Sequence, residues 1–250
     1  LHPLCDDLIP FGSDLTSKEF PIDIMFCDKC FTAHQRYQVP REELFLPGYH
    51  YRARMTGSVI QGMRELVDQC EKRFGNLSGF SVLDVGCNDG SLLDLFQERG
   101  CKTIGIEPTD AAHDSKHLTI NKFFDVEARN EVLDAIGKPD LITFTNVFAH
   151  IDNLNLLLEN LRALIGPSTR VVIENHYLGA VLKYGQFDTF YHEHPRTYSA
   201  RSFTFIAEKL GLKVLDIEFV SRYGGNVRAF LGHGEKNIAL EEHLDFEAGF

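Results

Sequence analysis

The 250-residue sequence has no cluster of basic residues, no long apolar run and no dense set of cysteines. Its 36 acidic residues outnumber its 25 basic residues, and the formal net charge is −11. Nucleic-acid binding depends on clustered Lys and Arg side chains that neutralise phosphates, and a helix needs roughly 20 apolar residues to cross a bilayer. The absence of both patterns argues against nucleic-acid and membrane partners and predicts a soluble protein.

The six cysteines are spread over the chain, which is unlike the disulfide framework of a small secreted domain. We therefore expect reduced thiols and a cytoplasmic protein. The length suits one α/β domain with a smaller appendage, and there is no internal repeat. Because the sequence starts at Leu1 rather than Met and stops within a polar, helix-like stretch, we expect it to be part of a longer protein.

The first 50 residues predict a small irregular module, since prolines interrupt any periodic pattern. Apolar residues then recur at helical spacing from Met55 to Phe74, and Gly75 predicts the end of that helix. Further along, short β-branched runs alternate with helical stretches. The expected strands read FSVLDVG, KTIGIEP, DLITFTNV and RVVIEN. This alternation predicts an α/β, Rossmann-like, doubly wound and mostly parallel sheet.

The last third of the sequence departs from this alternation. An insertion rich in aromatic, His and Gly residues predicts a loop-rich wall or lid. Ser199 is expected to cap a helix that ends at Gly211, and two strands around Gly224 and Gly225 predict a closing antiparallel hairpin. The expected divisions are a module at 1–50, a main domain at 51–235 with the insertion at about 176–199, and the start of a helix leading to a C-terminal domain at 236–250.

A glycine-containing loop follows the first expected strand of the sheet. It reads Asp84-Val85-Gly86-Cys87-Asn88-Asp89-Gly90, and its glycines allow a tight turn and a close approach of the backbone to a ligand. A dinucleotide-binding loop would have glycine where Asn88 stands, and Asp84 would repel a pyrophosphate. Glu107 ends the next expected strand, about twenty residues later, where a carboxylate accepts hydrogen bonds from ribose hydroxyls. These features indicate a nucleoside ligand without a phosphate.

This segment resembles the class I methyltransferases, whose first motif has the form D/E-x-G-x-x-x-G and whose acidic residue after the second strand holds the ribose. The resemblance implies S-adenosylmethionine as the cofactor. The residues that it implies as cofactor contacts are Asp84, Gly86, Asn88, Asp89, Gly90 and Glu107, together with Asn146 at the end of the fourth strand.

Polar side chains gather where this fold would place its substrate. They are His150, His176 and the run Tyr191-His192-Glu193-His194 in the insertion. A strongly polar run between aromatic neighbours indicates a functional site. Histidines two apart in a loop lack the spacing of a metal motif, and methyl transfer from a sulfonium needs no metal, so we expect no metal there.

The combined motifs resemble the sugar C-methyltransferase family over nearly the whole chain. They are FDTFYHEH at 187–194 with Tyr198-Ser199, ENHYLG at 174–179, YGGNVR at 223–228 and the GCNDG form of the loop. Those enzymes methylate C3 of nucleotide-linked 4-keto-deoxysugars. The resemblance therefore implies a methyltransferase with a nucleotide-sugar substrate.

The same resemblance implies roles for individual residues. His194 matches the proposed base of that family. The implied sugar-site residues are Tyr191, Glu193 and His150, and a tyrosine that is best matched by Tyr51, with Tyr49 as the alternative. A carbon beside a ketone becomes nucleophilic only after it loses a proton, so the site needs a base and a donor for the enolate oxygen. His194 suits the first role, and Tyr191 or His150 suits the second.

Cys27 and Cys30 have the spacing of half a structural zinc site, which needs four ligands. Cys5, His2 and His34 are poor candidates for the other ligands by spacing. The related enzymes carry a second Cys-x-x-Cys upstream. The resemblance thus implies that the intact protein binds zinc through Cys27 and Cys30.

Three other functions stay open at this point. An O- or N-methyltransferase acting on a sugar or another small molecule would use the same cofactor site and base. A nicotinamide-dependent oxidoreductase is favoured by the α/β pattern, but Asp84 and Asn88 argue against it. A catalytically inactive cofactor-binding module would keep the fold, and the presence of His194 argues against that reading. The candidates to bind an anionic substrate are Arg196, Arg201, Arg222 and Arg228.

Overall fold

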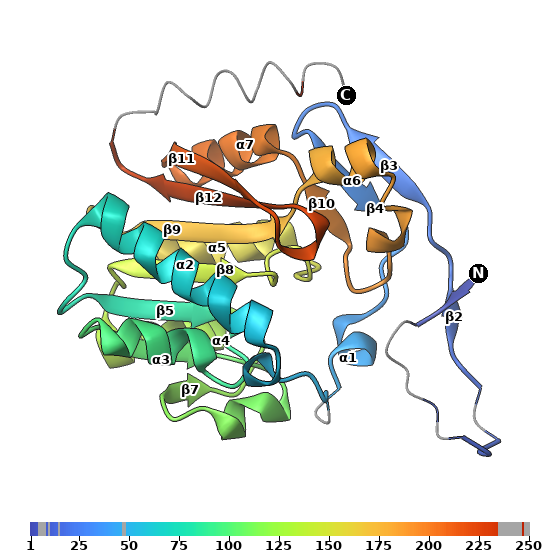
Figure 1. The fold of residues 1–250 in the computed structure, drawn as a ribbon, viewed down its shortest axis with the longest axis horizontal. Helices are drawn as coiled ribbons and strands as arrows, with labels where there is room; N and C mark the ends of the chain where they lie inside the picture. Colours follow the sequence, from blue (N-terminus) through green and yellow to red (C-terminus); the bar gives the residue numbers. More distant parts are fainter. Residues whose placement is uncertain (5–8, 10, 15, 47–48, 235–246, 248–250) are drawn as a thin grey trace.

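A seven-stranded sheet forms the centre of the protein (Figure 1) in the computed structural model, which describes residues 1–4, 9, 11–14, 16–46, 49–234 and 247. The strand order is β11-β12-β9-β8-β5-β6-β7. The parallel strands are β5 (Ser81–Val85), β6 (Lys102–Ile106), β7 (Leu118–Ile120), β8 (Leu141–Thr145) and β9 (Arg170–His176). β12 (Asn226–Gly232) pairs antiparallel with both β9 and β11 (Lys213–Val220). This topology confirms the predicted doubly wound sheet closed by a hairpin.

Helices cover both faces of this sheet (Figure 1). On one face α2 (Gly57–Phe74) packs against α3 (Ser91–Glu98), and their apolar side chains share a buried cluster with Val82 and Phe230 of the sheet. The helices of the other face are α4 (Val126–Ile136), α5 (Leu154–Leu164) and α7 (Ala200–Leu210). Each face thus has its own core, as an α/β sheet with crossover helices requires.

Local sequence signals explain where these helices begin and end. In α2 the buried residues Val59, Met63 and Leu66 recur at helical spacing, and Gly75 ends the helix with a φ of 82°. In α7 the side chain of Ser199 accepts a hydrogen bond from the backbone N–H of Ser202, which completes a capping box. These boundaries agree with the sequence predictions within two residues.

The N-terminal module and the insertion form one small sheet, which the sequence did not predict. β4 (Thr32–Gln35) lies between β3 (Ile24–Cys27) of the module and β10 (Arg196–Tyr198) of the insertion. The sequence predicted an irregular module and a loop-rich insertion and missed these strands, because strands so short show no clear alternation and β10 gains its hydrogen bonds from a partner over 160 residues away.

The remaining elements are short. They are β1 (His2–Pro3), β2 (Glu19–Phe20), α1 (Arg41–Leu44), α6 (Leu178–Tyr184) and the 3-10 turns η1 (Ala53–Met55), η2 (Asp110–Asp114), η3 (Phe187–Thr189) and η4 (Arg222–Gly224). The helix expected at 236–250 lies outside the described residues, except for Glu247. The carboxylate of Glu247 accepts hydrogen bonds from the backbone N–H groups of Ala200 and Arg201 at the start of α7.

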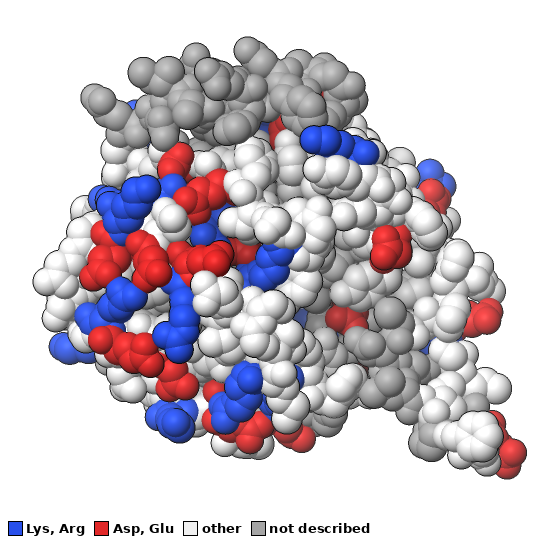
Figure 2. Space-filling view, viewed as in Figure 1, with Lys and Arg blue, Asp and Glu red and all other residues white. Residues whose placement is uncertain are grey.

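Acidic and basic side chains alternate on the face that carries α2 and α3 (Figure 2). Arg99 of the α3 end, for example, pairs with Asp68 and Glu71 of α2. Such exposed pairs each contribute little stability, on the order of 0–1 kcal/mol. Among the described residues, no helix is both long and apolar enough to cross a membrane.

Candidate functional site

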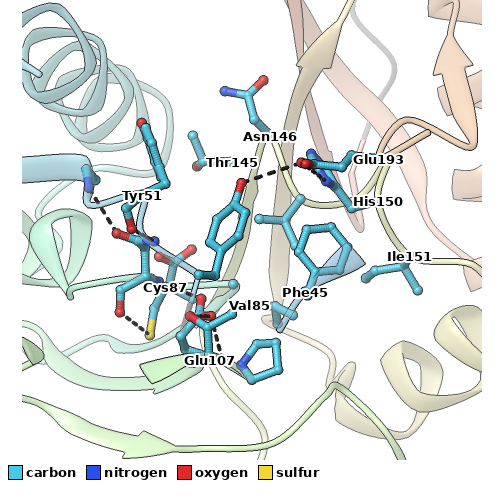
Figure 3. A pocket seen from close by; sticks show the side chains of 18 of the residues that line it. Phe45, Tyr51, Val85, Cys87, Glu107, Thr145, Asn146, His150, Ile151 and Glu193 are labelled. Carbon is cyan, nitrogen blue, oxygen red and sulfur yellow. Dashed lines mark hydrogen bonds and ion pairs between the residues drawn. The ribbon is translucent and has the colours of Figure 1, made fainter. Parts of the chain in front are cut away.

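A cavity of about 400 Å³ opens at the carboxyl ends of the parallel strands. Its wall includes the last residues of β5, β6, β8 and β9, which are Val85, Ile106, Thr145 and His176. Figure 3 shows Glu193 and His150 on one side of this space and Glu107 and Tyr51 on the other. Ligands of doubly wound sheets bind at this edge. The fold therefore brings the predicted loop and the predicted histidines to one cavity.

The predicted loop turns tightly from β5 into α3. Gly86 has a φ of 73°, and a Cβ there would lie 2.4 Å from Cγ2 of Val147. Asn88 has a φ of 51°, and its backbone N–H donates to Oε2 of Glu107 at 3.0 Å. Both Gly86 and Asn88 line the cavity. The loop thus needs glycine at position 86 because neither the backbone angle nor the space admits a side chain.

Glu107 directly follows β6, and its carboxylate already accepts three hydrogen bonds from the protein. Oε1 accepts hydrogen bonds from the backbone N–H of Thr109 at 2.9 Å and from its hydroxyl at 2.6 Å. Oε2 accepts the Asn88 N–H. A carboxylate offers about four lone-pair sites, so Oε2 retains the capacity to accept from one ligand hydroxyl in the cavity.

Asp84 is buried below the loop and accepts a hydrogen bond from the hydroxyl of Thr143 at 2.7 Å. Burial raises its pKa to about 7, and the negative charge of Glu107 adds to that rise. Because this carboxyl holds a proton more tightly in the folded state than in the unfolded state, folding stability falls as the pH rises from about 4 to about 7.

We therefore expect Asp84→Asn to raise the free energy of unfolding by about 2–4 kcal/mol at pH 8 and to have little effect at pH 3.5. The amide keeps an acceptor for Thr143 but has no charge to bury. Urea unfolding of both proteins across this range tests the prediction, with exposed Asp134→Asn as the control for loss of one charge. A difference that is the same at pH 8 and pH 3.5 would contradict it.

Asp89 and Gly90 lie beside the cavity and not on its wall. The Asp89 carboxylate accepts hydrogen bonds from Ser91 and from the backbone and guanidinium of Arg54. A Cβ at Gly90 would meet the side chain of Ser115 at 2.7 Å. These two residues shape the loop from behind, and their assignment as cofactor contacts stays a prediction.

Asn146 follows β8 and lines the cavity (Figure 3). It has a φ of 54°, which is uncommon for a residue other than glycine. Its backbone N–H donates to the carbonyl of Glu174 at 2.7 Å, and its side-chain oxygen accepts from Asn226 at 3.0 Å. Neighbouring strands thus hold Asn146 in a strained conformation at the cavity wall, which is where the sequence placed it.

Three imidazole rings meet at the other side of the cavity. The ring centroids of His150 and His176 lie 4.9 Å and 5.0 Å from that of His194. The three come from the end of β8, the end of β9 and the insertion. Burial lowers the pKa of all three, and that of His150 falls to about 4. The described structure therefore presents a wall of neutral imidazoles at physiological pH.

The hydrogen bonds of His194 define which ring nitrogen carries the proton. Nδ1 lies 3.0 Å from the carbonyl oxygen of Thr189, which accepts only, so Nδ1 is the donor. Nε2 is then the acceptor and lies 3.1 Å from the hydroxyl of Tyr191. Burial, followed by the neighbouring His150 and His176, lowers the pKa of His194 well below its usual range. His194 is thus an oriented, neutral imidazole whose Nε2 has the lone pair that can accept a proton.

The two candidate tyrosines lie at different ends of the cavity. Tyr49 donates a hydrogen bond to Oε2 of Glu193 at 3.5 Å, and that oxygen lies 4.0 Å from Nδ1 of His150. Tyr51 bonds to Tyr223 instead, and burial raises its pKa. Tyr49 therefore joins the histidine side, and Tyr51 lies near the loop.

Thr145 and Tyr223 line the cavity, although the sequence assigned no role to either of them. Tyr223 has a φ of 53°, and its ring lies 5.7 Å from that of His176. The Gly224-Gly225 pair predicted a turn, but it did not predict which side chains of that turn would line the cavity. The one local sign of a role for Tyr223 was an aromatic residue next to two glycines.

The four candidate arginines do not gather at the cavity. Arg196 donates to the carbonyls of Ile151 and Asp152, and Arg201 stacks over the ring of Phe31 at 4.8 Å. Arg228 is buried against Glu174 and Glu218. Only Arg222 of the four lines the described cavity.

Cys27 and Cys30 lie together at the turn between β3 and β4 as free thiols. Hydrogen bonds from the backbone of Cys30 lower the pKa of Cys27, and burial raises that of Cys30. Among the described residues, no group of three or more His, Cys, Asp or Glu side chains is arranged to hold a metal ion. Two thiols do not complete a tetrahedral zinc site, so the zinc prediction gains no support here.

Comparison with known proteins identifies relatives of this chain. The model of a family described as a methyltransferase domain matches residues 51–217. The chain is 33% identical over 233 residues to the C-methyltransferase NovU of Streptomyces niveus, covering 91% of this chain and 55% of that protein. It is 26% identical over 111 residues to the ubiquinone biosynthesis O-methyltransferase of Rhodopseudomonas palustris, covering 42% and 44%. The chain thus spans about half the length of these curated relatives.

Among solved structures, the fold is similar to that of a magnesium protoporphyrin IX methyltransferase from Synechocystis with bound SAH. The TM-score is 0.52 at 15% sequence identity, and the match covers 69% of this chain and 81% of that one. At this identity the likeness concerns the fold, and it confirms the predicted Rossmann-like class I methyltransferase architecture.

Proposed function

This chain belongs to the methyltransferase domain family, and from that premise we propose that it is an S-adenosylmethionine-dependent methyltransferase. The proposed reaction is methylation of C3 of a nucleotide-linked 4-keto-deoxysugar. The observation that carries this proposal is the oriented base His194, which faces the same cavity as Gly86 and Glu107. A cofactor loop and a positioned base in one cavity are what methyl transfer to an acidic carbon requires.

The cofactor end of the cavity suits an adenosine without phosphates. Glu107 Oε2 can accept a ribose hydroxyl, and the absence of a Cβ at Gly86 allows close approach of the loop. When bound, S-adenosylmethionine supplies an electrophilic methyl group on a sulfonium. The S-adenosylhomocysteine in the Synechocystis structure, described there as SAH, supports this choice of cofactor.

The histidine end of the cavity suits a ketone with an acidic neighbouring C–H bond. His194 Nε2 takes the proton, and Thr189 stabilises the resulting imidazolium through Nδ1–H. The Tyr191 hydroxyl, which now donates to Nε2, is the donor to the enolate oxygen once substrate is bound. Tyr49 and Glu193 lie beside His150 and are placed to bind sugar hydroxyls. The similarity to the C-methyltransferase NovU supports carbon as the acceptor.

O-methylation is the second candidate, because a hydroxyl acceptor would also use His194 as its base. The similarity to the ubiquinone biosynthesis O-methyltransferase, which covers 42% of this chain, favours O-methylation. The two functions differ in product. A new C–CH₃ resonance in the NMR spectrum of the methylated sugar supports the first candidate, and an O–CH₃ resonance supports the second.

Calorimetric titration tests the cofactor assignment. We expect the protein to bind S-adenosylhomocysteine and not NAD, and we expect Glu107→Ala to weaken that binding about tenfold to a hundredfold, because a charge-assisted hydrogen bond is lost. The matched control is Glu159→Ala, which removes an exposed carboxylate of α5. Binding of NAD, or unchanged affinity in Glu107→Ala, would contradict the proposed site.

A further inference from the structure

One guanidinium of the cavity wall has a donor that no described residue pairs with. Arg222 lies in η4, and its side chain is 10% exposed. It donates through Nη1 to the carbonyl of Val59 at 3.1 Å and through Nη2 to the carboxylate of Glu174. Its Nε is buried and has no hydrogen-bond partner among the described residues. A buried donor left unpaired is destabilising by about 1–3 kcal/mol. Because Arg222 lines the cavity, a ligand bound there can supply the missing acceptor.

The surroundings of Arg222 hold the guanidinium in a fixed place. A Cβ at Gly62 of α2 would lie 2.3 Å from Nη1, so α2 approaches the side chain closely. Glu174 is fully buried, and its other carboxylate oxygen, Oε2, pairs with Arg228. A fixed guanidinium loses little entropy when it binds an anion, which favours binding.

Arg222 lies between the loop and the histidines of the cavity, since it is close to Tyr51 and to the ring of Tyr223. Glu107 marks the nucleoside end at β6, and β5, β8 and β9 follow in that order across the sheet. Arg222 is bonded to Glu174 of β9. It also lies near Tyr51: burial raises the pKa of Tyr51, and the positive charge of Arg222 opposes that rise. The backbone carbonyl of Tyr51 accepts a hydrogen bond from the side chain of Asn88 in the loop. Arg222 therefore faces the part of the cavity beyond the loop.

The charges of the cavity wall make this position distinctive. Among the described residues, Arg41 and Arg222 are the lysine or arginine side chains that line the cavity, whereas several Asp and Glu side chains line it. Arg41 stacks over the ring of Phe123 at 4.3 Å, next to the nucleoside end. Arg222 is thus the cation available to an anionic group that lies beyond the ribose.

We infer that Arg222 binds the carboxylate of the amino-acid part of S-adenosylmethionine, with Nε–H as the donor that the described part of the chain leaves unpaired. The inference rests on the proposed function, because it assumes that cofactor. It assigns Arg222 to binding of the cofactor rather than of the anionic sugar nucleotide, for which the sequence had offered it as one of four candidates.

The test compares two ligands that share a nucleoside. S-adenosylhomocysteine has the amino-acid group, whereas 5′-methylthioadenosine lacks it. We expect Arg222→Gln to weaken binding of S-adenosylhomocysteine about tenfold to a hundredfold by calorimetry, since a hydrogen bond to a charged group is lost. The affinity for 5′-methylthioadenosine should change less than about twofold, and its binding also shows that the variant is folded.

Arg41→Gln is the matched control, because it removes the other cation of the cavity at the nucleoside end. It should change the affinities for both ligands by the same factor. If Arg222→Gln leaves the ratio of the two affinities unchanged, the inference is overturned. If Arg222→Gln binds neither ligand, Arg222→Lys replaces it, and an unchanged ratio in that variant overturns the inference as well. Failure of the unaltered protein to bind S-adenosylhomocysteine would instead contradict the proposed function.

Discussion

Replacing His194 with asparagine should slow methyl transfer to a 4-keto sugar nucleotide about a hundredfold to ten-thousandfold, the range expected for loss of a positioned base. The Nε2 atom that would take the proton is lost, whereas the asparagine side chain can still donate to the Thr189 carbonyl. The affinity for S-adenosylhomocysteine should stay within about threefold of that of the unaltered protein, because His194 lies at the opposite end of the cavity from Glu107.

Proton abstraction can be measured apart from methyl transfer. In D₂O and without cofactor, the unaltered protein should exchange the C3 protons of the 4-keto sugar nucleotide, and NMR follows the loss of that signal. The matched control is His192→Asn, since His192 is bonded to the carbonyl of Phe20 and does not line the cavity. Exchange at the normal rate in His194→Asn would show that another group is the base, and slow exchange in both variants would show only a disturbed insertion.

Gly86→Ala should abolish measurable binding of S-adenosylhomocysteine and lower the free energy of unfolding by about 2–4 kcal/mol. Two effects add. The backbone is left-handed, with a φ of 73°, and the new Cβ would lie 2.4 Å from Cγ2 of Val147. To relieve the backbone strain or the steric clash, the loop must move away from the position in which the Asn88 N–H donates to Glu107.

Two further variants separate these effects. Gly79 has a φ of 90° with no atom within 4 Å of an added Cβ, so Gly79→Ala carries the backbone strain alone and should leave ligand affinity unchanged. Gly86→Ala combined with Val147→Ala removes the clash and should recover part of both stability and binding. Normal affinity in Gly86→Ala would mean that this loop does not hold the cofactor.

The elements of the central sheet and its helices were predictable because their signals are local. Helical spacing and a terminal glycine mark α2, and a side-chain cap marks α7. The loop at Gly86 was also predictable, since a strand, a tight turn and a helix follow one another within a few residues. Local backbone preferences and burial patterns act over such short distances, so a single sequence displays them.

Other features could not be read from neighbouring residues. The pairing of β4 with β10 joins segments over 160 residues apart, and neither of these short strands has a sequence pattern that identifies the strand it pairs with. Asp89 belongs to the loop motif, yet its side chain turns to Arg54, away from the cavity. Whether Tyr49 or Tyr51 reaches the histidines also depended on the path of the chain between them and the sheet.

The sequence by itself determined the fold class and the tight turn at residues 84–90, and it contained the residue types that the proposed proton abstraction needs, because these depend on periodicity, backbone angles and intrinsic acidity. Only the tertiary structure decided that His150, His176 and His194 share one buried wall, which lowers their pKa values together. It also decided that Arg222, at the cavity, has a donor unpaired among the residues that the structure describes. Burial and the direction of a side chain are properties of the packed chain, since each is set by residues distant in sequence.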